Sequence, residues 1–198
     1  MTARPAIDPD SVEIRPLTPE RWSHVERLFG PVRGGHGGCW CQWFRLMRAD
    51  YEALDRDGRK HRFADLVKHG PPPGILAYVD DLAVGWCAVA PRSSQPRLDK
   101  GIVSKRLGTD DYQQTWVITC LYVDTAWRRR GLMRPLVEGA VGFAKGQGAR
   151  NVEAYPMIPH DRTSNLDLYV GELTTFLSCG FRQIAKPLPR RAVVRRAV

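Results

Sequence analysis

No run of about 18 consecutive apolar residues occurs in this sequence, so no stretch of it has the length of a membrane-spanning helix. The N-terminus also lacks the apolar core of a signal peptide, and we therefore expect a cytoplasmic protein without a membrane partner. Cysteines are few, and their odd number, five, argues for reduced thiols and against a disulfide framework. No internal repeat or linker divides the 198 residues, which predicts one domain.

Acidic residues are absent after Glu172, although the chain has a net charge of +9. Six basic residues follow in that segment: Arg182, Lys186, Arg190, Arg191, Arg195 and Arg196. Such a cluster attracts phosphates, but a solvated basic surface is the common alternative. No helix-turn-helix, RNP or zinc-finger pattern accompanies it, so a nucleic-acid-binding protein is a less favoured alternative and we expect no specific nucleic-acid partner.

Hydrophobic patterning predicts an α/β fold. Residues 1–11 hold two prolines and no periodicity, which predicts a flexible N-terminus before a domain over residues 12–198. The predicted order is a strand, a helix, one or two helices over residues 46–69, three strands, a helix, a strand, a helix and two closing strands. The strand, helix and strand over residues 116–155 form the parallel unit of an α/β sandwich.

The most specific feature is a basic turn between a buried strand and an amphipathic helix. The strand ends at Leu121, Tyr122 and Val123, and the turn contains Arg128, Arg129, Arg130 and Gly131. Unpaired main-chain amides at a helix N-terminus bind anions, and a glycine lets the backbone approach a ligand closely. The combination suits a pyrophosphate, and a plain crossover with a basic turn is the alternative.

The run Arg128-Arg129-Arg130-Gly131-Leu132-Met133 resembles the Arg/Gln-x-x-Gly-x-Gly/Ala hallmark of the GNAT acetyltransferase superfamily. It departs from that hallmark at Met133. The later run Phe176-Leu177-Ser178-Cys179-Gly180-Phe181 resembles the Tyr-x-x-x-Gly-Phe segment of the same superfamily, with phenylalanine in the tyrosine position. The chain is similar in particular to a bacterial GNAT subgroup.

The resemblance implies a GNAT-type mixed, mostly antiparallel central sheet of six to seven strands, with a splayed pair of central strands and about four flanking helices. It implies acetyl-CoA as co-substrate and an amine of a small molecule or peptide as acceptor. The backbone of Leu121, Tyr122 and Val123 would bind the pantetheine arm. The pyrophosphate would lie on the turn formed by Arg128, Arg129, Arg130, Gly131, Leu132 and Met133. The resemblance implies no metal, and it leaves a homodimer open.

Direct transfer of the acetyl group requires a base for the amine and an acid for the leaving thiolate. Glu153, near the expected strand fork, is the first candidate for the base, with a structural ion pair to Arg182 as the alternative. Tyr155 is the candidate acid, with packing beside the cofactor as the alternative. Phe176 cannot donate a proton, which leaves an acyl-CoA sensor without turnover as a competing function.

A Cys-Trp-Cys segment follows a glycine-rich loop. His36, Cys39 and Cys41 do not have the paired spacing and four ligands of structural zinc, so we expect no metal there. Trp40 and Trp43 are predicted to shape the acceptor pocket, since aromatic walls are common in ligand sites. Packing of both rings in the core is the alternative.

Overall fold

The computed structural model describes residues 5–30, 34–35, 37–101, 103, 112–159 and 167–198. Its strands are β1 (Glu13–Pro16), β2 (Gly74–Val79), β3 (Leu82–Pro91), β4 (Thr115–Val123), β5 (Asn151–Ala154), β6 (Arg182–Leu188) and β7 (Arg191–Ala197). They form one seven-stranded sheet in the order β1-β2-β3-β4-β5-β7-β6, in which β4 and β5 are the parallel pair. The mixed, mostly antiparallel sheet predicted from the sequence is confirmed.

The described residues form five α-helices, where the resemblance implied about four. They are α1 (Trp22–Phe29), α2 (Arg48–Glu52), α3 (Arg56–His69), α4 (Met133–Gly146) and α5 (Leu173–Ser178). The extra helix arises within residues 46–69. The Asp55 carboxylate accepts a hydrogen bond of 2.7 Å from the Gly58 amide and caps a new helix, so this segment divides into α2 and α3.

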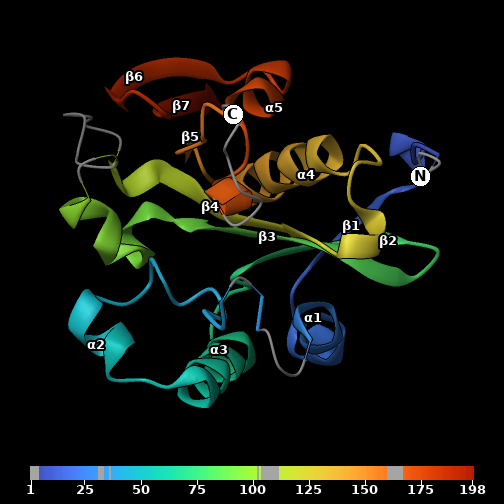
Figure 1. Ribbon diagram of the computed structural model, residues 1–198, viewed down its shortest axis with the longest axis vertical. Coiled ribbons are helices and arrows are strands. Elements are labelled where there is room, and N and C mark those ends of the chain that lie inside the picture. Colours follow the sequence, from blue (N-terminus) through green and yellow to red (C-terminus); the bar gives the residue numbers. More distant parts are fainter. Residues whose placement is uncertain (1–4, 31–33, 36, 102, 104–111, 160–166) are drawn as a thin grey trace.

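Helices cover both faces of the sheet (Figure 1). Helix α4 lies on one face, and α1 and α3 lie on the other. The two faces draw alternate residues from the same strands: Ile75 and Val79 of β2 pack in the cluster under α4, whereas Leu76 and Tyr78 pack in the cluster with α1 and α3. Burial on both faces explains why β2 and β3 are almost continuously apolar in sequence.

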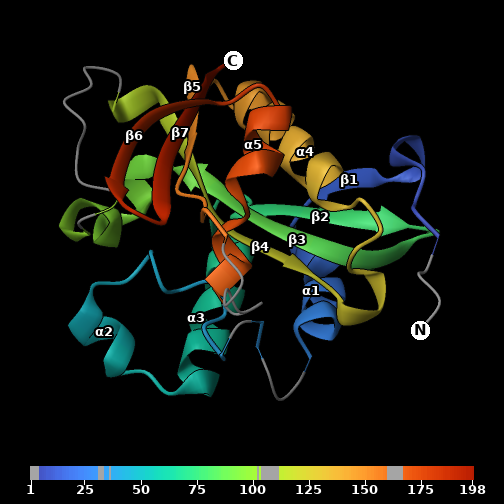
Figure 2. The same cartoon turned by 45° about the horizontal axis from the view of Figure 1, so that its top comes forward.

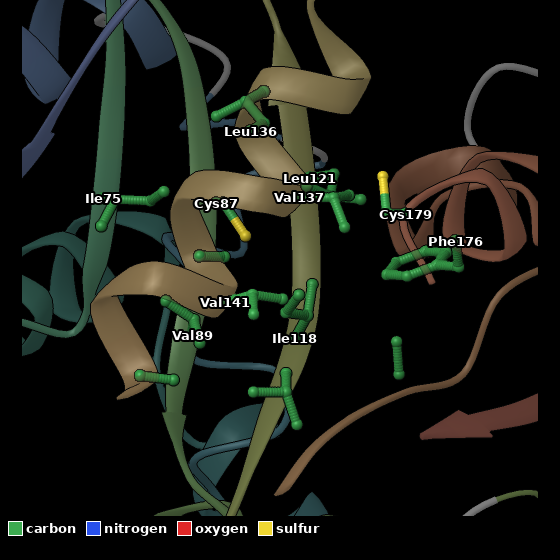
Figure 3. Packing of buried hydrophobic residues seen from close by; sticks show 14 of the residues in the cluster. Ile75, Cys87, Val89, Ile118, Leu121, Leu136, Val137, Val141, Phe176 and Cys179 are labelled. Carbon is green, nitrogen blue, oxygen red and sulfur yellow. The ribbon is translucent and has the colours of Figure 1, made fainter. Parts of the chain in front are cut away.

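Helix α4 connects β4 to β5 and holds them in place through its apolar face. Figure 3 shows Val137 and Val141 of α4 beside Leu121 and Ile118 of β4, with Phe176 of α5 on the other side. Leu136 and Val137 are completely buried, and each such side chain contributes about 1.5–3 kcal/mol to folding. This packing fixes the start of α4 relative to the end of β4.

The described N-terminal residues contact the turn before α4. The Ile7 amide donates to the Arg130 carbonyl at 3.0 Å, and Arg130 Nε donates to the Pro5 carbonyl at 3.0 Å. The flexibility expected for residues 1–11 stays a prediction. In the described parts of the chain, no helix has the length and apolar character that crossing a membrane requires.

Candidate active site

The turn after β4 is ordered by its own side chains. The Asp124 amide donates to the Val84 carbonyl at 2.9 Å, and the Asp124 carboxylate accepts from the Ala126 amide at 2.8 Å. A 3₁₀ turn, η6 (Thr125–Trp127), follows, and Arg128 Nε donates back to the Val123 carbonyl at 3.0 Å. Asp124 therefore caps the turn.

The last residues of the turn present main-chain amides at the start of α4. Arg129 and Gly131 have φ angles of +59° and +90°, and a Cβ at Gly131 would meet no atom within 4 Å. No side chain of the described residues caps the N-terminus of α4, which begins at Met133. Pro135 lies in the first turn of α4, where its missing amide costs nothing. This geometry is that of a helix-terminus anion site.

A cavity of about 380 Å³ opens against this turn, and we call it the donor cavity. It is lined by Leu121, Val123, Trp127, Arg128, Arg129, Gly131, Leu132, Met133, Arg134, Leu168, Gly171, Glu172, Thr175 and Ser178. The structure therefore brings together most of the residues predicted to bind the cofactor. Tyr122 and Arg130 are not among the lining residues. Tyr122 packs in the cluster that contains residues of α1 and α3, and Arg130 Nε is hydrogen-bonded to the Pro5 carbonyl.

The donor cavity has a positive wall. Arg128, Arg129 and Arg134 line it, with Glu172 as the acidic residue among the described lining residues, and Arg128 Nε is hydrogen-bonded to the Val123 carbonyl. Among the described residues, neither these three nor Arg130 forms an ion pair with a carboxylate. Their charge therefore adds to the positive end of the α4 dipole, which favours a phosphate ligand.

Strands β4 and β5 separate beside the donor cavity. They pair from Thr115 opposite Asn151 to Ile118 opposite Ala154, and residues 119–123 of β4 continue without β5. A bulge lies at the same point: Ile118 pairs with Val89 and Cys120 with Ala88, so Thr119 has no partner in β3. The fork implied by the resemblance thus coincides with a break in the regular ladder.

The segment η7 (Asp167–Val170) packs beside β4 near this fork (Figure 2). Leu168, together with the adjacent Gly171, lines the donor cavity, whereas Tyr169 and Val170 line a second cavity of about 220 Å³. We call the second one the acceptor-side cavity. Its lining residues are Trp43, Phe44, Arg97, Leu98, Gly101, Val103, Tyr155, Tyr169, Val170 and Arg191. One short segment therefore forms a wall of both cavities.

Glu153 lies in a buried polar network. Its Oε1 pairs with Arg195, and its Oε2 lies 3.3 Å from Arg92 Nη1 and accepts a 3.0 Å hydrogen bond from the Tyr155 hydroxyl. Arg92 also donates to that hydroxyl. Burial, followed by the charge of Glu153, raises the pKa of Tyr155 well above its ordinary value. Arg182, the ion-pair partner considered in the sequence, is exposed on β6 and takes no part in the network.

Of these two predicted catalytic residues, Tyr155 lines the acceptor-side cavity and Glu153 does not. The cavity also contains residues that the sequence did not single out as a site. Arg97 lies in a 3₁₀ turn, η4 (Pro96–Lys100), whose sequence shows no hydrophobic periodicity. Arg191 was noted only as part of the basic C-terminal segment. Arg97 and Arg191 are brought to the same cavity by tertiary contacts that no local sequence pattern indicates.

The two predicted acceptor-site tryptophans have different surroundings. Trp43 is 39% exposed and lines the acceptor-side cavity, with the Arg97 guanidinium 3.6 Å from its ring centre. Trp40 is 1% exposed and packs against Trp22 and Phe29, with ring centres 6.0 and 5.5 Å away. The structure thus places Trp40 in the core, which was the alternative interpretation, and only Trp43 at a cavity.

The two cysteines of the Cys-Trp-Cys segment are partly buried. Trp86 Nε1 donates to Cys41 Sγ at 3.0 Å, and a hydrogen bond with Cys120, together with burial, raises the pKa of Cys41 well above its ordinary value. No group of potential metal ligands occurs among the described residues, and His36 lies outside them. Phe176, in the superfamily's tyrosine position, is fully buried against Phe181.

Comparison with known proteins gives the family. The sequence profile of the acetyltransferase (GNAT) family matches residues 40–169. No curated protein matches the chain in sequence.

Solved structures share the fold at low identity. A GCN5-related N-acetyltransferase from Kribbella flavida has a TM-score of 0.56 and 17% identity, over 96% of this chain and 100% of that chain. An N-acetyltransferase from Staphylococcus aureus Mu50 has a TM-score of 0.54 and 14% identity, over 94% and 98%. The PaiA N-acetyltransferase from Thermoplasma acidophilum, solved with coenzyme A, has a TM-score of 0.50 and 11% identity, over 95% and 99%. Because the family profile spans most of the sequence, including the strand fork and the basic turn, this chain belongs to the GNAT acetyltransferase family.

Proposed function

We propose that this enzyme transfers the acetyl group of acetyl-CoA to an amine by direct attack, with the donor and the acceptor entering from opposite sides of η7. The observation that carries the proposal is the anion site at the start of α4. It opens into a cavity lined by Leu121 and Val123 of β4, in the part of that strand that continues beyond its pairing with β5. The coenzyme A in the Thermoplasma acidophilum neighbour, which has the same fold, agrees with this assignment.

The residues of the donor cavity fit a coenzyme A ligand. The space above Gly131 and the uncapped start of α4 suit a diphosphate, which we assign to the amides of residues 129–133. Arg129 and Arg134 supply countercharge. The pantetheine arm would follow the backbone of Leu121, Tyr122 and Val123. When bound, the thioester supplies an activated carbonyl as acyl donor.

We assign proton transfer to Tyr155 and Glu153 acting together. Tyr155 lines the acceptor-side cavity, and its hydroxyl donates to Glu153 Oε2. As the amine nitrogen bonds to the acetyl carbon and gives up its proton to the Tyr155 oxygen, the phenolic proton passes to Glu153, so the tyrosine is never left charged. The carbon–sulfur bond breaks, coenzyme A leaves as a thiolate, and the thiolate takes up a proton from solvent. The raised pKa of Tyr155 agrees with this, because it keeps the hydroxyl protonated at neutral pH.

Two measurements test the proposed function. Calorimetric titration with acetyl-CoA should show binding to the intact protein, and release of the coenzyme A thiol should depend on an added amine. Hydrolysis without amine and thiol signal from the enzyme alone are the controls. Failure to bind at millimolar concentration would refute the proposal. Binding without thiol release across a broad amine panel would instead favour the acyl-CoA sensor.

A further inference from the structure

The acceptor-side cavity has a chemistry of its own, which bears on the unidentified amine. We propose that it recognises an amine that also carries a carboxylate and an apolar or aromatic side chain, the chemistry of an apolar α-amino acid. This inference rests on the proposed function, because it assigns the acceptor of that same reaction.

The position of the cavity favours an acceptor over a second cofactor. Tyr169 and Val170 line it, while Leu168 and Gly171, on the same segment, line the donor cavity. Tyr155 also lines it, directly after the last β5 residue paired with β4 at the fork. A ligand amine in this cavity therefore lies on the far side of η7 from the donor, next to the point where β4 and β5 separate.

The charged residues that line the cavity are both cationic. Among the described residues, Arg97 and Arg191 are its charged lining groups, and no carboxylate lines it. The two nearby acids are already engaged. Both oxygens of Glu153 are held by arginines and Tyr155, and Asp99 accepts from Arg92 at 3.4 Å and from the Tyr112 hydroxyl at 2.8 Å. A polycationic acceptor would therefore meet like charge, whereas a carboxylate would meet opposite charge.

Both guanidinium groups are positioned before a ligand arrives. Arg97 lies on the Trp43 ring and donates to the Trp43 carbonyl at 3.4 Å. Arg191 donates from Nη1 to the Tyr155 carbonyl at 3.3 Å. Each guanidinium has five N–H donors in a fixed fork that matches a carboxylate, and the main-chain bonds use one of them. Arg191 is also hydrogen-bonded to the Tyr169 side chain, so both guanidinium groups keep donors for a ligand. Little side-chain entropy remains to be lost when an anion binds.

The rest of the wall is apolar and the space is small. Trp43, Phe44, Leu98 and Tyr169 contribute apolar or aromatic surface. A volume of about 220 Å³ lies below the range of roughly 300–1,000 Å³ that is typical of drug-sized ligands. The cavity therefore suits a single apolar side chain next to a carboxylate, and a large polyhydroxylated or extended acceptor would not be enclosed.

A matched acceptor series tests the inference. L-Phenylalanine, its uncharged amide and phenylethylamine share one side chain and differ in the carboxylate, and spermidine represents polycations. Acetyl transfer is followed by thiol release, with kcat/KM corrected for the fraction of neutral amine. We expect phenylalanine to exceed phenylethylamine by roughly 10- to 100-fold, as charge-assisted hydrogen bonds to a carboxylate would give.

Variants connect that preference to the two arginines. Arg97→Gln and Arg191→Gln should each reduce the ratio of phenylalanine to phenylethylamine toward one, chiefly by lowering kcat/KM for phenylalanine. Arg182→Gln removes the same charge from an exposed position on β6 and should leave the ratio unchanged. An equal or higher rate with phenylethylamine or spermidine in the wild-type protein would overturn the inference, as would a ratio that survives both cavity substitutions.

A binding experiment separates failure of the inference from failure of the proposed function. Protein saturated with coenzyme A is titrated calorimetrically with phenylalanine and with phenylethylamine. Tighter binding of phenylalanine that is lost in Arg97→Gln would support the carboxylate site even if no amine in the series released thiol. Equal binding of the two ligands, with normal acetyl-CoA affinity, would refute the carboxylate site while leaving the donor site intact.

Discussion

Gly131→Asp tests whether the turn before α4 holds the diphosphate of the donor. Gly131 has a φ angle of +90°, and a Cβ added there would meet no atom within 4 Å. The substitution therefore creates no clash. Its structural cost is the positive φ angle, which disfavours an L-residue by about 1–2 kcal/mol. Because the space above Gly131 is open, the new carboxylate is available to repel an anion.

The electrostatic part of the effect is larger than the strain. A carboxylate about 5 Å from a phosphate charge, at an effective dielectric constant of about 20, is repelled by about 3 kcal/mol. That corresponds to more than about 100-fold in the dissociation constant for acetyl-CoA. The loss should be smaller at high ionic strength, because salt screens charges at an exposed site.

Gly131→Asn is the matched control, because asparagine has nearly the shape of aspartate, carries no charge and tolerates a positive φ angle. Calorimetry should show a modest loss of affinity for Gly131→Asn and near abolition for Gly131→Asp, with similar thermal unfolding of the two variants. If both variants bind acetyl-CoA as tightly as the wild type, the diphosphate does not lie on this turn. If both lose affinity equally, backbone strain and not charge is responsible.

Four further predictions concern the buried network and Gly171, the residue after η7. Glu153→Gln removes the carboxylate that pairs with Arg195 and leaves Arg92 with Asp99 as its remaining carboxylate partner, so urea unfolding should show a loss of about 3–5 kcal/mol, and a loss below about 1 kcal/mol would contradict the buried ion pair. Tyr155→Phe should lower kcat while leaving acetyl-CoA affinity unchanged, and an unaltered kcat would exclude the proton relay. Because burial raises the pKa of Tyr155, the folded protein keeps a proton that the unfolded chain loses, so stability present below about pH 10 should fall as pH rises further, and Tyr155→Phe should flatten that decline. Gly171→Ala, at a φ of +77° with its Cβ 2.7 Å from Phe176, should lower the melting temperature and weaken acetyl-CoA binding, whereas Gly142→Ala, in open space on α4, should do neither.

The gathering of the β4, turn and α4 residues around one cavity could be predicted because these residues are local in sequence. A buried strand, a basic turn with Gly131 and an amphipathic helix follow one another directly, and each has its own pattern. The number of helices in residues 46–69 could not be decided from the sequence, because the boundary between α2 and α3 depends on one capping side chain, Asp55. The order of the strands and helices elsewhere follows from apolar runs and agrees with the structure.

The partners of Glu153 could not be predicted because they depend on the register of the closing strands. Glu153 lies opposite Arg195 in the β5–β7 ladder, whereas Arg182 lies opposite Arg195 in the next ladder, β6–β7. The sequence places several arginines within reach, and strand order alone decides which one faces the carboxylate. Arg92 comes from yet another segment, at the end of β3, and joins through tertiary packing.

The extra residue in β4 at the Thr119 bulge decides which side chains of that strand face α4 and line the donor cavity. Before the bulge, Trp116 and Ile118 face α4, and Val117 faces the other side. Strict alternation would then turn Cys120 and Tyr122 toward α4. Because Thr119 has no partner in β3, the alternation is reversed, and Leu121 and Val123 face α4 and line the donor cavity instead. The Tyr122 ring, which would otherwise enter that cavity, packs with Phe29 on the α1 side. The apolar residues of β4 do not reveal this reversal, since both faces of the strand are buried, yet it decides which side chains line the donor cavity.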